Sequence, residues 1–243
     1  MDDHAFAAAL ARDAGALLRE IRKGALAGRA LGDEGDRQAQ QLLSARLREQ
    51  RPDDAVLSEE AADDTARLSA ERVWIIDPLD GTREFSEDGR TDWAVHVGLW
   101  AHGGLAAGAV ALPALDLVLA TPSVPSPPPP DGPRPRVVVS RTRPPDFAGA
   151  VAWALGGELV EMGSAGAKTI AVVRGEADAY VHAGGQYEWD SAAPVAVAIA
   201  ARLHASRIDG SPLTYNRPDP YLPDLVVCRP ELATQILGAI AAA

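Results

Sequence analysis

A proline-rich stretch near the middle of the chain, "TPSVPSPPPPDGPRP", constrains the fold more than any other segment. Proline lacks a backbone N–H and fixes φ, so this stretch can form neither a helix nor a central strand of a sheet. We expect a stiff, extended connector over residues 122–136, with a ligand for a proline-binding module as the alternative. The connector predicts two subdomains, residues 1–121 and residues 137–243.

The first subdomain is predicted to contain two helices followed by strands. Apolar residues at helical spacing predict an amphipathic helix over residues 3–22 and a second helix around residues 39–47, which ends before Pro52. The intervening "GALAGRALGDEGD" predicts a glycine-rich break between them. Short strands are expected at "AVLS" and "RVWII", and "WAVHVGLW", "LAAGAVAL" and "LDLVLA" predict an antiparallel meander.

The second subdomain alternates between strand and helix patterns. The expected strands are "RVVVS", "ELVEM", "DAYVHA" and "DLVVC", and the expected helices are "AGAKTIAVVRG", "SAAPVAVAIAARL" and "ELATQILGAI". Such alternation predicts a layered α/β arrangement.

Charge and composition limit the partners of this chain. The 243 residues are 47% hydrophobic, enough for a sizeable core, and the net charge of −11 disfavours a nucleic-acid polymer or an anionic membrane surface. A small phosphorylated substrate stays compatible, because bound cations can reverse the local field, and a homodimer stays open. Cys228 is the single cysteine, the start "MDDHAF" is acidic, and no apolar run reaches the roughly 18 residues of a membrane span. We therefore expect a cytoplasmic protein.

The stretch "WIIDPLDGTREF" places two carboxylates, Asp77 and Asp80, at the end of an apolar strand. A simple turn would explain the Pro, Asp and Gly. Two carboxylates held this close repel one another, however, and hard cations or protons relieve the repulsion. Mg²⁺ prefers oxygen ligands, and the Leu79 carbonyl supplies a further one. The N–H groups of Gly81 and Thr82 at a helix start would bind an anion, so the stretch predicts a Mg²⁺ site beside a phosphate cradle.

Other acidic residues are candidates for the same site. Glu59 and its neighbour Glu60 follow the strand "AVLS", Asp190 precedes a helical run, and Asp36 lies near the second helix. The alternatives are plain ones: Asp190 or Ser191 as a helix N-cap, and Asp36 in a solvated loop. Since the chain has 34 acidic residues, each of these positions alone carries little weight.

Taken together, the motifs resemble those of the inositol monophosphatase-like superfamily, the Mg²⁺-dependent, lithium-sensitive phosphatases. "WIIDPLDGTREF" and "YEWDSAAPVAVAIAARL" match its two signatures, and the resemblance covers nearly the whole chain. "DPLDGTREF", "VVVSRTR" and "GGQYEWDSAAP" are most similar to the 3′(2′),5′-bisphosphate nucleotidases. The resemblance implies a layered αβαβα sandwich, hydrolysis of the 3′-phosphate of 3′-phosphoadenosine 5′-phosphate to AMP, a place in sulfate assimilation, two or three Mg²⁺ ions and inhibition by lithium.

The resemblance also implies roles for particular residues. It assigns the metal ions to Glu59, Asp77, the Leu79 carbonyl, Asp80 and Asp190. It assigns the attacking water to Glu59 and Thr82, with Asp36 as a further acid nearby. The phosphate would contact Asp80, Gly81, Thr82 and Asp190. The candidate nucleotide contacts are Ser140, Arg141, Lys168 and Tyr187. The chain departs from the family pattern at Ala165 and Gly166, where paired serines are common.

Other interpretations stay open at this stage. An inositol 1-phosphate or fructose 1,6-bisphosphate phosphatase would carry the same core motifs, because these grip metal and phosphate rather than the leaving group. A metal-binding or nucleotide-binding protein without turnover is the alternative outside the enzymes. His96 and His182 are expected to be structural. Arg141 and Arg143 are either solvated or contacts of a substrate phosphate, and Tyr187 either stacks on a base or packs.

Overall fold

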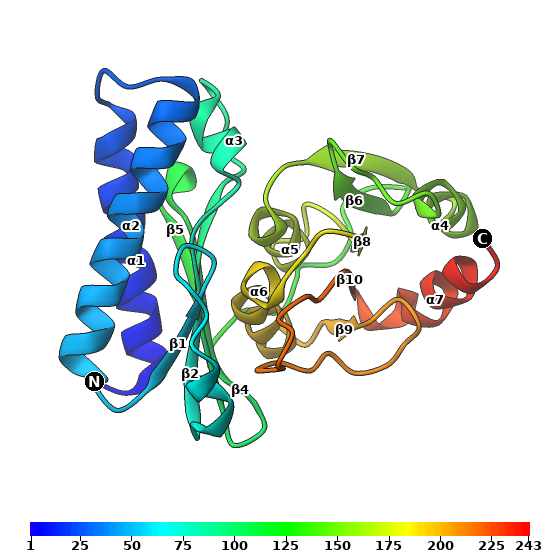
Figure 1. The fold of residues 1–243 in the computed structure, drawn as a ribbon. Helices are drawn as coiled ribbons and strands as arrows, with labels where there is room; N and C mark the ends of the chain where they lie inside the picture. The colour runs from blue at the N-terminus through cyan, green and yellow to red at the C-terminus, as the bar shows by residue number, and fades with distance from the viewer.

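The structure, a computed structural model, describes residues 1–243 and contains two five-stranded sheets separated and covered by helices (Figure 1). The first sheet has the order β1-β2-β3-β4-β5, with β1 parallel to β2 and all other neighbours antiparallel. Its strands are β1 Ala55–Ser58, β2 Arg72–Asp80, β3 Ala94–Ala101, β4 Gly104–Leu112 and β5 Leu117–Ala120. The predicted meander is therefore confirmed.

The second sheet has the order β7-β6-β8-β10-β9. Strand β6 is parallel to β7 and β8, whereas β10 is antiparallel to β8 and β9. The strands are β6 Arg136–Ser140, β7 Glu158–Met162, β8 Ala179–Ala183, β9 His204–Ser206 and β10 Asp224–Cys228. The parallel pairs have a helix in the connection between their strands, as parallel pairing requires, whereas β10 follows β9 without a helix between them.

Helices form the remaining three layers (Figure 1). Helices α1 Asp3–Arg22 and α2 Gly28–Gln50 pack on the outer face of the first sheet. Helices α5 Ala165–Val173 and α6 Glu188–Ala200 lie between the two sheets, in the largest apolar cluster. Helices α4 Ala148–Leu155 and α7 Ala233–Ala241 cover the far face of the second sheet, over a core that includes Cys228. The predicted αβαβα layering is confirmed.

The second helix begins earlier than the sequence predicted. It starts at Gly28, so the glycine-rich break is short and Asp36 lies on the helix. A Cβ atom on Gly32 would lie 2.7 Å from the methyl group of Thr82, and one on Gly35 would lie 2.9 Å from the Leu79 side chain. These glycines therefore allow α2 to approach the end of β2 and the short helix α3 Thr82–Ser86 that follows it.

A few elements were not predicted. They are α4, β9 and three short 3₁₀ helices at Thr65–Ser69, Pro113–Leu115 and Pro230–Leu232. Strand β2 also continues past its apolar run as far as Asp80. The proline-rich segment 121–135 contains neither helix nor strand, and the division into subdomains stays a prediction. None of the helices combines the length and apolar character that crossing a membrane demands.

Candidate active site

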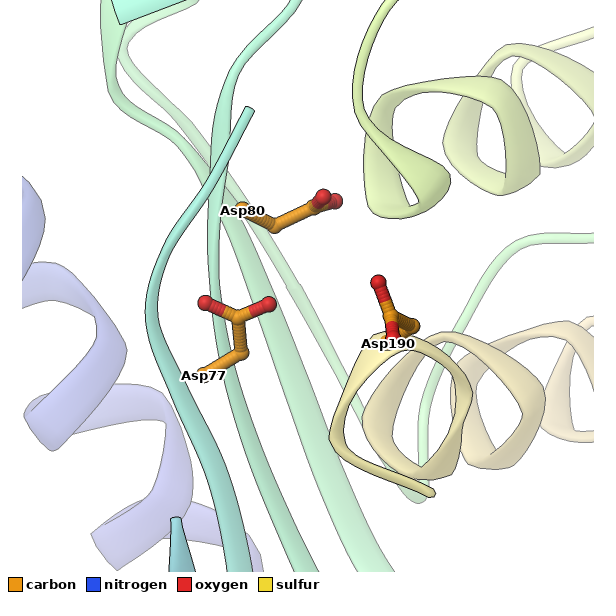
Figure 2. Close-up of side chains that lie close together, drawn as sticks. All are labelled: Asp77, Asp80 and Asp190. Atoms are coloured by element: carbon orange, nitrogen blue, oxygen red, sulfur yellow. The ribbon is translucent and has the colours of Figure 1, made fainter. Parts of the chain in front are cut away.

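The end of β2 turns two carboxylates toward one point. Residues three apart on a regular strand face opposite sides of a sheet, because side chains alternate. The register of β2 against β3 shifts between Asp77 and Asp80. This irregularity brings both carboxylates to the side that faces α6, as Figure 2 shows. Both residues are buried there, since Asp77 is 1% and Asp80 7% exposed.

Asp190 completes an acidic triad from the first turn of α6 (Figure 2). Carboxylate oxygens of Asp77, Asp80 and Asp190 all lie within 4.8 Å of one another. The simpler alternative, in which Asp190 is the N-cap of this helix, is wrong. Tyr187 occupies that position, and its backbone N–H donates to Oδ2 of Asp190 at 2.8 Å. The helix start therefore orients Asp190 toward the end of β2.

Asp80 is surrounded by groups that stabilise its charge. The hydroxyl of Ser164 and the N–H of Gly166, the latter at 2.7 Å, donate to Oδ2, and Nε2 of His96 lies 3.2 Å from the same oxygen. Burial alone would raise the pKa of Asp80, but His96, Ser164 and the charge of Lys168 together lower it below its usual range. These neighbours therefore favour the ionised form of Asp80.

The neighbouring acids behave in the opposite way. Burial, followed by the charges of Glu59 and Asp80, raises the pKa of Asp77 well above its usual range. Burial and the Asp80 charge raise the pKa of Asp190 to about 7. Glu59 is an exposed residue, yet the loss of water around its carboxyl group and the charge of Asp80 raise its pKa to about 7 as well. This crowding favours either protons or a bound cation.

Thr82 and Asp36 lie beside the triad. The Thr82 hydroxyl donates to the Leu79 carbonyl at 3.2 Å. Asp36 is half-buried on α2, which excludes the solvated loop considered above. Burial and the charge of Glu60 raise its pKa to about 7, while a hydrogen bond with Thr82 opposes the rise. The structure therefore brings close together the five acids and Thr82 that the resemblance grouped.

Gly81 connects β2 to α3 with a left-handed backbone, at φ +86° and ψ +45°. Residues with a Cβ atom adopt this conformation with strain, and a Cβ atom here would also lie 3.1 Å from that of Ser164. The turn starts α3 next to the triad, so its first backbone N–H groups lie beside the acids.

A cavity of about 630 Å³ opens beside this turn, and its lining is almost entirely polar. Seven of the sequence-predicted site residues line it: Asp80, Gly81, Thr82, Ser140, Arg141, Lys168 and Asp190. Asp36, Glu59, Asp77 and Leu79 are not among its lining residues. The cavity is thus a recess for a polar ligand with the acids at one end.

Two predicted nucleotide contacts are engaged with the protein itself. Nζ of Lys168 is buried and donates to the carbonyls of Gly163 and Ser164, both at 2.8 Å. Burial lowers its pKa to about 8, although nearby acids, Asp80 first, oppose this. Arg141 bridges to α3 and the residue that follows it, because its guanidinium contacts the carboxylates of Glu84 and Glu87, each at 2.6 Å.

Tyr187 does not line the cavity. Its ring stacks on that of Trp189 at a centroid distance of 4.8 Å and meets Tyr221 edge-on. The ring is still 39% exposed, so its role as a base contact stays a prediction.

Sequence reasoning missed the part that His96, Ser164 and Gly166 play around Asp80. His96 was expected to be structural, and its Nδ1 does donate to the Trp189 carbonyl at 3.1 Å. Its other nitrogen faces Asp80. The sequence signal for this role was an ionisable residue inside the apolar strand "WAVHVGLW". In the structure His96 pairs with Asp77 on the neighbouring strand β2.

The ligand atoms in this cluster fit a hard divalent cation. They are the carboxylate oxygens of Asp77, Asp80 and Asp190, whereas His96 uses its Nδ1 on the Trp189 carbonyl and faces Asp80 with Nε2. Such an oxygen-only set is typical of Mg²⁺ rather than of zinc or copper.

Comparisons with known proteins agree with this geometry. The model of the inositol monophosphatase family matches residues 3–123 and 137–242. The chain is 56% identical over 261 aligned residues to the 3′-phosphoadenosine 5′-phosphate phosphatase of Mycobacterium leprae (strain TN), covering 99% of this chain and 94% of that one. It is 30% identical over 187 residues to the 3′(2′),5′-bisphosphate nucleotidase CysQ of Escherichia coli (strain K12), covering 72% and 76%.

A solved structure shares the fold. Inositol monophosphatase II of Staphylococcus aureus MSSA476 superposes with a TM-score of 0.81 at 22% identity, covering 99% of this chain and 96% of that one. The fold, the match over almost all of the sequence and the acidic cluster lead to one conclusion: the chain belongs to the inositol monophosphatase family.

Proposed function

We propose that the chain is a Mg²⁺-dependent phosphatase that removes the 3′-phosphate of 3′-phosphoadenosine 5′-phosphate, giving AMP and inorganic phosphate. The observation that carries the proposal is the acidic triad at one end of a polar cavity whose walls hold four cationic side chains: Arg83, Arg141, Arg143 and Lys168. Such a recess suits a substrate with one phosphate at the acids and further negative charge beyond it. The activity of the Mycobacterium leprae relative supports the same substrate.

The acids would hold the metal. Their carboxylates and one carbonyl would accommodate two or three Mg²⁺ ions: Glu59, Asp77, Asp80, Asp190 and the carbonyl of Leu79. Bound Mg²⁺ would supply charge neutralisation for the scissile phosphate and acidify water. Bound Mg²⁺ would offset the repulsion between the neighbouring carboxylates, which together with burial raises the pKa values of Asp77 and Asp190.

Residues of the chain would orient the two reactants. Glu59 and Thr82 would hold the attacking water, with Glu59 as the proton acceptor. Asp36, whose carboxyl group lies near Thr82, would help to orient that hydroxyl. The N–H groups of Gly81 and Thr82 would hold the phosphate in line with the water.

The rest of the substrate would occupy the far part of the cavity. Ser140 and Arg141 follow β6, and Lys168 lies on α5, so this wall belongs to the second sheet and its helices. Ser140, Arg141, Lys168 and Tyr187 stay predictions as nucleotide contacts. The cytoplasmic location stays a prediction as well.

The test is phosphate release from three substrates: 3′-phosphoadenosine 5′-phosphate, inositol 1-phosphate and fructose 1,6-bisphosphate. We expect kcat/KM to be highest for the first by at least about tenfold, the value of one well-placed ionic contact. A higher kcat/KM for inositol 1-phosphate would replace the proposal by the inositol phosphatase alternative. No turnover of any of the three in Mg²⁺ would favour the non-catalytic alternative.

A further inference from the structure

The four cationic side chains of the cavity are not equally free to bind a substrate. Arg141 forms ion pairs with Glu84 and Glu87, and Lys168 spends two of its three donors on backbone carbonyls in a buried position. Arg83 and Arg143, by contrast, are exposed, and neither forms an ion pair. The cavity therefore offers two free guanidinium groups.

The two free guanidinium groups belong to different walls. Arg83 lies on α3, directly after Thr82, and its charge acts on the carboxylate of Glu87. Arg143 lies in the loop after β6, on the wall of the second sheet. A phosphate held at the triad leaves the second wall for the remainder of a bisphosphate, which favours Arg143.

The loop that carries Arg143 is braced from several directions. The N–H of Arg143 donates to the Ser140 hydroxyl at 3.2 Å, and the N–H of Arg141 donates to the Met162 carbonyl at 3.2 Å. The side chain of Arg141 then ties the loop to Glu84 and Glu87. The brace holds the backbone of the loop that carries Arg143, so less of the loop has to be ordered on binding and the entropic cost is lower.

The turn that faces Arg143 is shaped to admit it. Gly185 has φ +73°, and a Cβ atom on it would lie 2.6 Å from Nη1 of Arg143. The carbonyl of the preceding Gly184 accepts a hydrogen bond from Nε2 of His182 at 2.8 Å, which holds the turn against β8. The guanidinium thus lies beside a glycine turn on the cavity wall, where it stays accessible to a ligand.

His182 lines the same cavity but does not act as a cation there. Burial, then the charges of Lys168 and Arg143, lower the pKa of His182 to about 4, so the ring is neutral at physiological pH. His182 therefore supplies no charge to an anion here, and Arg143 is the exposed cation of this wall.

We propose that Arg143 binds the second, non-scissile phosphate of the substrate, and that Arg141 is a positioning residue that braces the loop. This inference rests on the proposed function, because it takes the substrate to be a bisphosphate. The planar guanidinium would donate two N–H groups to phosphate oxygens. The discrimination between a nucleoside bisphosphate and a monophosphate would then come from Arg143.

A pair of matched substrates tests the proposal. 3′-Phosphoadenosine 5′-phosphate and adenosine 3′-monophosphate carry the same scissile phosphate and nucleoside and differ only in the 5′-phosphate. We expect Arg143→Ala to raise KM for the bisphosphate by about 10- to 100-fold with little change in kcat, and to change KM for the monophosphate less than threefold. Arg143→Lys should recover part of the loss, because it keeps the charge without the fork.

Arg83→Ala is the matched control, since it removes an equally exposed guanidinium from the opposite wall. It should change kcat/KM for both substrates by the same factor. Binding of AMP and of adenosine to the Mg²⁺-loaded protein gives a second readout: Arg143→Ala should weaken AMP binding about 10- to 100-fold and leave adenosine unchanged. Arg141→Ala should lower Tm and affect both substrates.

The outcomes separate this proposal from the proposed function. Equal losses on both substrates in Arg143→Ala, or a selective loss in Arg83→Ala instead, would overturn the assignment of Arg143 and leave the activity intact. Equal kcat/KM of the unmutated protein for the bisphosphate and the monophosphate would likewise overturn the role of Arg143, whereas no phosphate release from 3′-phosphoadenosine 5′-phosphate in Mg²⁺ would show that the proposed function itself is wrong.

Discussion

His96 places its Nε2 atom 3.2 Å from Oδ2 of Asp80, while its Nδ1 atom donates to the carbonyl of Trp189, next to Asp190. One ring thereby joins the segments that carry two members of the triad. Burial of the ring opposes its protonation, but the Asp80 charge prevails and raises the pKa of His96. The space for this ring depends on Gly166, because a Cβ atom there would lie 2.0 Å from Nε2 of His96.

Gly166→Ala should therefore destabilise the protein by about 1–3 kcal/mol, the range for overpacking a tight interior. Chemical denaturation of the metal-free protein measures this. Combining it with His96→Ala, which removes the clashing ring, should recover most of the cost of the added methyl group.

Gly149→Ala on α4 is the matched control for this substitution. Nothing lies within 4 Å of a Cβ atom at Gly149, so the change should be neutral or stabilise by about 0.5–1 kcal/mol. Equal free energies of unfolding for Gly166→Ala and the unmutated protein would mean that His96 is not held where the structure places it.

Asp77→Asn should lower kcat by about 100-fold or more, because loss of a metal ligand removes several kcal/mol of charge stabilisation in the transition state. Asn keeps an oxygen for the hydrogen bond that Asp77 accepts from the Leu79 N–H at 3.0 Å. The metal-free variant should have a higher Tm than the unmutated protein at pH 8, because a buried, repelled charge is gone.

Asp146→Asn, at an exposed position, serves as the control and should change neither kcat nor the Tm of the metal-free protein. Near-normal kcat for Asp77→Asn at saturating Mg²⁺ would exclude Asp77 as a ligand.

The rise of Tm produced by Mg²⁺ should grow with pH. The pKa values of Asp77, Asp190 and Glu59 are raised in the folded, metal-free protein, so their contribution to stability is present at low pH and is lost as pH rises through about 7. Mg²⁺ competes with these protons and replaces the lost stability. Thermal unfolding with and without Mg²⁺ should therefore show a small increase of Tm by Mg²⁺ at pH 5.5 and a large increase at pH 8. Equal differences at both values would show that the ion binds elsewhere.

Lithium should inhibit the enzyme in the millimolar range at low Mg²⁺. This expectation follows from family resemblance and not from any distance in the structure. Rates in lithium chloride should be compared with rates in sodium chloride at the same ionic strength. Equal rates would separate this chain from the lithium-sensitive members.

The layered fold was predictable because its local patterns agree with the final structure. The apolar run before Asp77 and the alanine-rich stretch after Asp190 are the strand and the helix they resemble. The start of α2 could not be predicted, because Gly32 and Gly35 suggest the end of a helix when only the local sequence is considered. Their presence inside the helix is explained by its close contact with Thr82 and Leu79.

The site shows the same division. Asp77, Asp80 and Asp190 were predictable as a group from their motifs, and the structure brings them together. Pro78, between Asp77 and Asp80, marks an irregularity in β2 because it cannot donate to the sheet, but the side to which both carboxylates turn depends on the register against β3. The ion pairs that engage Arg141 depend on Glu84 and Glu87, more than 50 positions away in the chain, and no local pattern contains them.

The most direct test of the account is the identity of the products of 3′-phosphoadenosine 5′-phosphate turnover, followed by phosphorus NMR. AMP and inorganic phosphate should appear in equal amounts with Mg²⁺, and no reaction should occur after chelation of the metal. Adenosine 3′-monophosphate as the product, or full turnover without divalent metal, would contradict it.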